Sequence, residues 1–115
     1  MKQQEHKLQV ACVRWLRMQY PNVLCFAIPN GGARNATTGA MLKAEGVLSG
    51  VPDLMIAQPT LKYSGLFIEM KFGKNKTSER QDEVIDLLRN VGYKVEVVRD
   101  FETFVNVVKN YLAGQ

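Results

Sequence analysis

Hydrophobic and polar residues alternate along the chain with two periods, one typical of helices and the other typical of strands. Repeats of three to four residues predict helices, whereas apolar runs and two-residue alternation predict strands. The patterns indicate helices near residues 3–19, 39–45, 79–91 and 101–112, and strands near residues 23–28, 53–57, 66–71 and 93–98. The order α, β, short α, β, β, α, β, α predicts an α/β domain with a mixed central sheet flanked by helices.

Capping and turn residues define the ends of these elements. N-caps are expected at Thr37 or Thr38, Ser78 and Asp100, and helix ends at Pro21, Gly46 and Gly92. Ser78 and Gln81 have the spacing of a capping box. Inward positions are expected for Val84, Leu87, Leu88 and Val91 in the third helix and for Phe101, Phe104, Val105, Val108 and Leu112 in the last. The strand at residues 23–28 is a continuous apolar run, which predicts that it is buried.

The composition is that of an ordinary globular protein. The chain has 115 residues, of which 46% are hydrophobic and 23% charged, and we expect a single domain spanning 1–115. Cys12 and Cys25 lie in apolar runs without CxxC spacing, so we expect both to be reduced core residues, as in an intracellular protein. Residues 1–7 lead into an amphipathic pattern. We therefore expect no signal peptide and no membrane span, and a place in the cytoplasm of a bacterial or phage-infected cell.

The net charge of +4 and the isoelectric point of about 9.2 are compatible with nucleic-acid binding. Many proteins of this charge bind no nucleic acid, so charge alone does not decide the partner. The one histidine, His6, leans toward solvent on the first helix. One histidine and two scattered cysteines exclude a zinc site of the usual composition.

Charged side chains interrupt the strand predicted near residues 66–71. In a strand, residues two apart point to the same face, so Glu69 and Lys71 are expected to project side by side. Asp53 opens a neighbouring strand directly after Pro52, a residue that is tolerated at the start of a strand. The face opposite Glu69 carries Leu66, Ile68 and Met70. Two carboxylates and one ammonium group are therefore predicted to converge at one edge of the sheet.

This set of groups has the chemistry that phosphodiester hydrolysis needs. Mg²⁺ prefers oxygen ligands and commonly takes one or two carboxylates, which Asp53 and Glu69 supply. The backbone carbonyl of Met70 can add a third oxygen. Lys71 would hold or deprotonate the attacking water, or stabilise the charged transition state. The alternative is an exposed strand with an ordinary polar face that follows a plain Pro-Asp turn.

Two further polar residues lie at unexpected positions. Glu5 is close to the apolar stripe of the first helix, where a charge is disfavoured unless it is paired or bound to metal. It is equally compatible with a frayed first turn that the helix dipole stabilises. Gln81 lies on the apolar face of the third helix. It can cap that helix with Ser78, or it can hydrogen-bond Lys71 or a catalytic water.

The order and spacing of these motifs, from about residue 4 to 98, are similar to those of a known nuclease family. The chain resembles the VRR-NUC (virus-type replication-repair nuclease) branch of the PD-(D/E)xK superfamily, in its stand-alone phage or bacterial form. The resemblance is carried by Glu5, Asn30-Gly31-Gly32, Gly50-Val51-Pro52-Asp53, Glu69-Met70-Lys71 and Gln81. The αβββαβ core of the restriction-endonuclease-like fold agrees with the predicted order, with the short helix as an excursion before the second strand.

The resemblance implies dependence on Mg²⁺ or Mn²⁺ and cleavage that leaves 5′-phosphate and 3′-hydroxyl ends. Asp53 and Glu69 would be metal ligands and Lys71 the catalytic lysine. Glu5 would assist the metal site, and Gln81 would orient the lysine or the water. Stand-alone relatives resemble Holliday-junction resolvases, which act as homodimers in DNA recombination and repair. A two-fold dimer suits a junction of near two-fold symmetry, because resolution requires two matched nicks.

Glycine and basic residues near the predicted site are candidate DNA contacts, because glycine lets backbone amides approach a phosphate. The candidates are Asn30, Gly31, Gly32, Arg34, Lys74, Lys76 and Arg80. A solvated run of charge is the alternative for the last three. Two other functions also remain: the same nuclease core acting on flaps or duplex DNA, and a non-catalytic nucleic-acid-binding module. The complete set of Asp53, Glu69 and Lys71 argues against the second of these.

Overall fold

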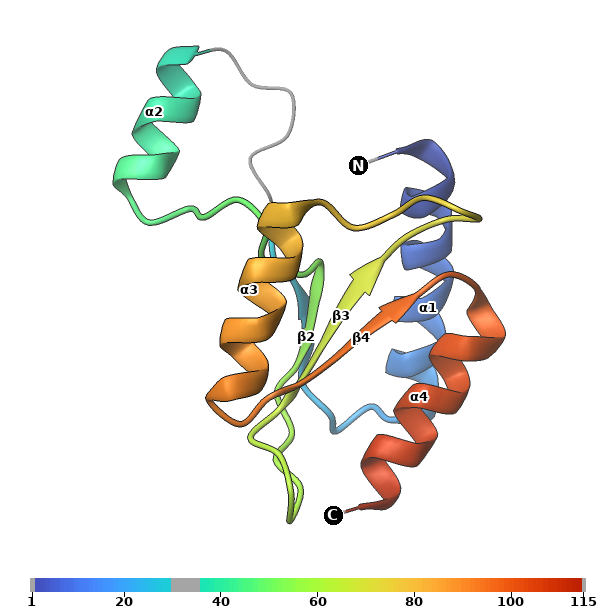
Figure 1. The fold of residues 1–115 in the computed structure, drawn as a ribbon. Coiled ribbons are helices and arrows are strands. Elements are labelled where there is room, and N and C mark those ends of the chain that lie inside the picture. Colours follow the sequence, from blue (N-terminus) through green and yellow to red (C-terminus); the bar gives the residue numbers. More distant parts are fainter. Residues whose placement is uncertain (1, 30–35, 115) are drawn as a thin grey trace.

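The centre of the molecule is a four-stranded mixed sheet in the order β1-β2-β3-β4 (Figure 1). The computed structural model describes residues 2–29 and 36–114. The strands are β1 (Cys25–Ala27), β2 (Leu54–Ile56), β3 (Leu66–Met70) and β4 (Lys94–Val98). β2 pairs antiparallel with both β1 and β3, whereas β3 and β4 are parallel. The helix α3 (Glu79–Asn90) connects the parallel pair, as such a crossover requires.

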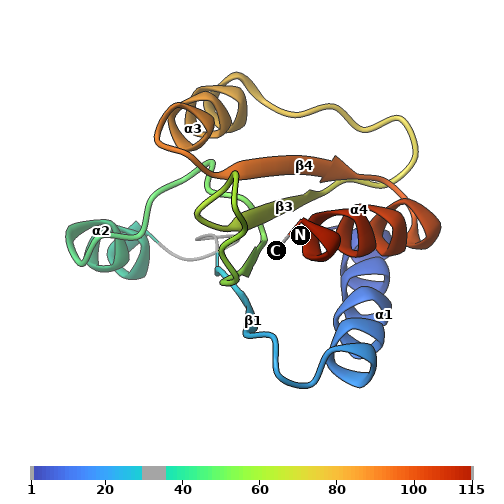
Figure 2. The same ribbon diagram turned by 90° about the horizontal axis from the view of Figure 1, so that it is seen from below.

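Helices cover both faces of this sheet, which confirms the predicted fold class. Figure 2 shows α1 and α4 on one side and α3 on the other, with α2 standing away from the sheet. The helices are α1 (Gln3–Gln19), α2 (Ala36–Ala44), α3 (Glu79–Asn90) and α4 (Phe101–Ala113). Within the described residues, no helix has the length and apolar character needed to cross a membrane.

The main core lies between the sheet and the α1–α4 layer. Its buried members are Cys12, Leu16, Cys25, Leu54, Ile56, Leu66, Ile68, Met70, Val98, Phe104, Val108 and Tyr111. A smaller cluster under α3 contains Phe67, Ile85 and Val95. The strand β3 therefore has apolar neighbours on both faces. Cys12 and Cys25 are free and buried, as predicted, and burial raises the pKa of the Cys12 thiol to about 12.

The first strand differs from its prediction. β1 has only three residues, and of these Cys25 is buried while Phe26 is 39% exposed and Ala27 is exposed. Among the described residues, β1 is an edge strand that pairs with β2 alone. The prediction of a buried strand over 23–28 was wrong because a continuous apolar run does not show whether a helix covers both faces.

Most predicted caps are present, with one exception. The Ser78 hydroxyl accepts a hydrogen bond from the Gln81 amide, and Asp100 accepts one from the Thr103 amide. Gly46, with φ +109°, follows the last turn of α2. Thr37 and Thr38 lie inside α2, which already includes residue 36, so the prediction that either of them caps this helix was wrong.

Two helices also bury different residues from those expected. In α3 the buried residues are Val84 and Ile85, whereas Leu87 and Val91 are 61% and 67% exposed. α3 packs on the sheet along a narrow stripe, so apolar residues just outside that stripe face solvent. In α4, Phe101 is 41% exposed and Tyr111, which was not predicted to point inward, is buried. The Tyr111 hydroxyl donates to the Gln58 carbonyl at 2.6 Å, which satisfies its polar end.

A close backbone contact brings the segment before β2 against the start of α3. Gly50 has φ +89°, a conformation that favours glycine. A β-carbon built on Gly50 would lie 2.8 Å from the backbone oxygen of Arg80. Because only glycine permits this approach, it fixes where Asp53 enters the sheet relative to the N-terminus of α3.

Candidate active site

Two carboxylates meet where β2 begins and β3 ends. β2 and β3 pair with Leu54 opposite Ile68, so the same register places Asp53 opposite Glu69. Asp53 Oδ2 accepts a hydrogen bond of 2.7 Å from the Met70 amide, which anchors the Asp53 side chain to β3. The predicted convergence of Asp53 and Glu69 is therefore present in the structure.

Glu69 is the most unusual residue of this pair, because it is a carboxylate with only 2% of its surface exposed. Its Oε2 accepts from Gln81 Nε2 at 3.3 Å and lies 3.9 Å from Lys71 Nζ. Within the described residues, Glu69 Oε1 is buried and accepts no hydrogen bond. An exposed, solvated strand face is therefore excluded for Glu69, and a buried acceptor with no donor is costly unless a proton or a cation is supplied.

The electrostatics of Asp53 and Glu69 also indicate that the pair needs a proton or a cation. Burial, and after it the charge of Asp53, raise the pKa of Glu69 from 4.5 to about 8. Burial also raises the pKa of Asp53, although the hydrogen bond from the Met70 amide opposes that rise. Two carboxyl groups this close resist being ionised together, so at neutral pH they require a shared proton or a bound cation.

The donor set fits a hard divalent cation. The acidic side chains that meet here are Asp53 and Glu69. No group of three or more His, Cys, Asp or Glu side chains within the described residues is arranged to hold a metal. The N–H and C=O of one strand residue point to the same side, so the Met70 carbonyl faces the Asp53 side, as its amide does. Mg²⁺ is commonly bound through one or two carboxylates and keeps several waters.

Gln81 has two roles at once. Its Oε1 accepts from the Ser78 amide at 2.9 Å and completes the capping box, as the spacing predicts. Its Nε2 donates to Glu69 rather than to Lys71. The first turn of α3 therefore orients the buried carboxylate directly, and the alternatives that the sequence left open for Gln81 are compatible with each other.

Glu5 is 7% exposed, so the interpretation of a frayed first turn was wrong. Its Oε2 accepts hydrogen bonds from the Phe72 amide at 3.3 Å and from Asn75 Nδ2 at 3.1 Å. Its charge also contributes to the raised pKa values of Asp53 and Glu69. Glu5 therefore lies near the carboxylate pair, and its place among the metal ligands stays a prediction.

The carboxylates line a cleft of about 1220 Å³. α1 contributes Glu5 to its lining, the segment around α2 contributes Leu42, Lys43 and Leu48, and the start of α3 contributes Ser78, Arg80 and Gln81. Lys2 and Lys71 also line it. The lining thus combines the carboxylate pair with one further carboxylate, Glu5, and with several cations.

The predicted DNA contacts are only partly within the described residues. Asn30, Gly31, Gly32 and Arg34 lie outside them. Lys74 and Lys76 are exposed in the loop after β3, and Arg80 Nη1 lies 3.0 Å from Glu83 Oε2 on the surface of α3. His6 is exposed, as expected.

Sequence reasoning did not single out Asn75 and Arg99, although both contact the loop beside the site. Asn75 Nδ2 donates to Glu5, and Arg99 Nη1 donates to the carbonyls of Gly73 and Asn75. Both residues come from polar stretches of ordinary composition. Their partners are 24 to 70 residues away in sequence, and no local pattern could have indicated these contacts.

Comparison with known proteins agrees with this geometry. The sequence profile of the VRR-NUC domain matches residues 3–101, whereas a search of curated proteins finds no match. A solved structure described as a VRR_NUC domain protein has the same fold, with a TM-score of 0.80 and 24% sequence identity over 99% of this chain and 92% of that one. The match covers most of the sequence, including Asp53, Glu69 and Lys71. The chain therefore belongs to the VRR-NUC domain family of nucleases, which are phosphodiesterases.

Proposed function

We propose that the protein is a metal-dependent, structure-selective DNA endonuclease whose active site is the cleft around Asp53, Glu69 and Lys71. The observation that carries the proposal is the Glu69 carboxylate, which is 2% exposed and has one oxygen without a hydrogen-bond donor among the described residues. A protein that used this cleft only for binding would gain nothing from burying two adjacent carboxylates.

Asp53, Glu69 and the Met70 carbonyl would hold Mg²⁺ or Mn²⁺. When bound, such an ion neutralises charge that develops on the phosphate and acidifies water. The residues of the chain have separate tasks around it. The Met70 amide holds Asp53, the Gln81 amide group holds Glu69, and the Lys71 ammonium places positive charge 3.9 Å from Glu69 Oε2. Lys71 can orient the attacking water or stabilise the transition state from there.

The basic residues that line the cleft support the proposal that it binds a DNA strand. Lys2, Lys43 and Arg80 line the same cleft as the carboxylates, while Lys74 and Lys76 are exposed beyond the end of β3. Basic side chains around a groove suit the phosphate backbone and carry no base specificity. The scissile phosphate would lie beside the carboxylates, and these cations would contact the phosphates on either side of it.

We further propose that the enzyme works as a homodimer on four-way junctions. A single copy offers one carboxylate pair, and resolution of a junction needs two nicks in strands related by near two-fold symmetry. A chain of 115 residues has little surface for DNA. Two copies related by a two-fold axis would therefore also widen the area that contacts DNA.

A substrate panel tests this proposal. Labelled four-way junctions, flaps and linear duplexes of matched sequence are incubated with the protein and Mg²⁺, and light scattering measures the mass of the protein and of its complex. We expect symmetric nicks in the junction, made by a dimer. Equal rates on all three substrates would instead favour a general flap or duplex nuclease. DNA binding without cleavage in Mg²⁺ or Mn²⁺ would leave the binding-module alternative.

A further inference from the structure

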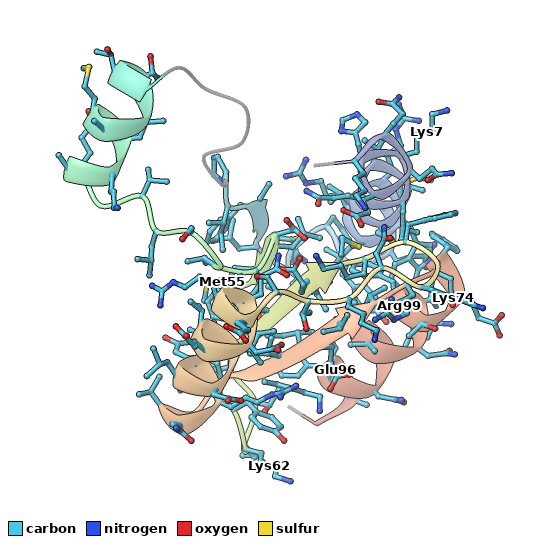
Figure 3. The ribbon with its side chains drawn as sticks, turned by 45° about the horizontal axis from the view of Figure 1, so that its top comes forward. Lys7, Met55, Lys62, Lys74, Glu96 and Arg99 are labelled. Atoms are coloured by element: carbon cyan, nitrogen blue, oxygen red, sulfur yellow. The ribbon has the colours of Figure 1, made fainter. Side chains whose placement is uncertain are left out.

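We propose that the outward face of α1 is a second DNA-binding surface, which contacts a duplex arm that branches away from the cleft. The cations of this face are Lys7, Arg14 and Arg17, all of them exposed. The inference rests on the proposed function and deepens it, because it names what the protein would select: two duplex arms at an angle to each other. Figure 3 shows Lys7 on the side of α1 that is turned away from the sheet.

The period of the helix places these cations together. Seven residues make nearly two helical turns, so Lys7 and Arg14 lie on one line along α1. The buried residues of the helix, Glu5, Cys12 and Leu16, lie on the opposite side of it. α1 therefore packs on the core with one face and presents cations on the other.

The charge of the outward face is uncompensated. Glu5 is the one acidic residue in α1, and it is buried. Within the part of the chain that the structure describes, no carboxylate forms an ion pair with Lys7, Arg14 or Arg17. A helix face that only meets solvent commonly carries charges of both signs in alternation. Like charges left unpaired on one face repel one another, and a bound polyanion removes that repulsion.

The other side of the sheet carries the opposite charge. α3 has two arginines and four acidic residues, and all four acidic residues are exposed. They are Glu79, Asp82, Glu83 and Asp86. Figure 2 shows α1 and α3 on opposite faces of the sheet. A phosphate backbone is therefore repelled on the α3 side and attracted on the α1 side, so we expect a DNA arm to leave the cleft past α1.

The outward face does not open into the cleft. Lys2, Glu5 and Gln9 line the cleft from the N-terminal end of α1. Lys7 and Arg14 are not among the described residues of the lining, because they lie on the far side of a helix about 10 Å wide. Duplex DNA is stiff over lengths of about 150 base pairs, so a short straight duplex in the cleft does not turn around α1. Branched DNA presents a second arm at an angle to the first, and that arm can lie along the outward face.

The spacing of the two cations fits a phosphate backbone. Lys7 and Arg14 are seven residues apart, which is about 10 Å along the helix axis. Successive phosphates of one strand advance about 3.4 Å along the duplex axis. Lys7 and Arg14 can therefore each contact a phosphate of the same strand, about three nucleotides apart.

Matched double variants test this surface. Lys7→Ala with Arg14→Ala removes two charges from the outward face, and alanine at exposed helical positions keeps the helix stable. Lys62→Ala with Lys94→Ala is the control. It removes the same charge from residues whose ammonium groups lie 5.6 and 5.3 Å from the centre of the Tyr63 ring. Figure 3 shows Lys62 at the opposite end of the molecule from Lys7.

Binding is measured without cleavage. Fluorescence anisotropy in EDTA gives the affinity for a four-way junction and for a linear duplex with the same arm sequences, over a range of salt concentrations. For the junction, Lys7→Ala with Arg14→Ala should lower the slope of log affinity against log salt by about 2. For the linear duplex, the slope should stay as in the wild type. The control variant should change neither slope.

An unchanged slope for the junction would remove the outward face of α1 from the DNA interface and overturn the proposal. Equal reductions for the junction and the duplex would overturn it too, because the face would then bind any duplex without selecting a second arm. A wild type that binds neither DNA would have the same consequence. A protein that binds junctions as predicted but cuts no DNA in Mg²⁺ would support this surface and refute the proposed endonuclease activity.

Discussion

The buried carboxylate pair should make the metal-free protein lose stability as pH rises. Glu69 has a pKa raised from 4.5 to about 8, so the folded state holds a proton that the unfolded state releases. The contribution of Glu69 to stability is therefore complete below about pH 4.5 and is lost as pH rises through about 8. The raised pKa sets an upper bound of about 5 kcal/mol on the free energy of unfolding that is lost above pH 8. Water in the open cleft can reorient around the carboxylates and reduce this cost. We therefore expect the free energy of unfolding to fall by about 2 kcal/mol.

The substitution Glu69→Gln should remove this loss and therefore stabilise the protein while abolishing its activity. Urea unfolding in EDTA is measured at pH 5 and pH 8 for the wild type, for Glu69→Gln and for Asp86→Asn, which changes an exposed carboxylate on α3. The free energy of unfolding of Glu69→Gln should exceed that of the wild type by about 2 kcal/mol at pH 8 and by much less at pH 5. Mg²⁺ should stabilise the wild type but not this variant. Equal stability of the wild type and Glu69→Gln at pH 8 would refute the reasoning.

Three other substitutions test separate parts of the account. Lys71→Ala should slow single-turnover cleavage by about 100-fold or more and leave DNA binding nearly unchanged; a variant that cleaves at the wild-type rate would remove Lys71 from the chemistry. Gly50→Ala places a methyl 2.8 Å from a backbone oxygen at φ +89° and should cost about 2 kcal/mol in thermal unfolding. Its control, Gly39→Ala, has nothing within 4 Å and should be neutral or slightly stabilising. The double change of Lys74 and Lys76 to Ala should lower the slope of log affinity against log salt by about 2, as filter binding can measure.

Local features of the fold were predictable from the sequence because short-range physics decides them. The caps at Ser78 and Asp100 depend on side chains three residues from the amides they bind. The pairing of Asp53 with Glu69 followed from two adjacent strands and from the two-residue period of a strand. Periodicity also identified Glu5 and Gln81 as polar residues near apolar faces.

What the sequence could not predict depends on tertiary packing. Phe26 and Leu87 are apolar by type, yet no neighbouring element covers them, and composition does not show which face stays open. The burial of Glu69 required apolar neighbours on both faces of β3, which only the arrangement of α1, α3 and α4 supplies. Asn75 and Arg99 make contacts across the chain, so neither residue shows a motif.

The most direct test of the central claim is cleavage of a labelled four-way junction under single-turnover conditions, with Mg²⁺ or EDTA, by the wild type and by Asp53→Asn. Asparagine keeps an oxygen for the Met70 amide, so the fold and DNA binding should be retained while the carboxylate charge is lost. We predict cleavage by the wild type in Mg²⁺, none in EDTA, and a rate at least about 100-fold lower for Asp53→Asn. Cleavage by Asp53→Asn at the wild-type rate, or cleavage that persists in EDTA, would contradict a metal-dependent site at this carboxylate pair.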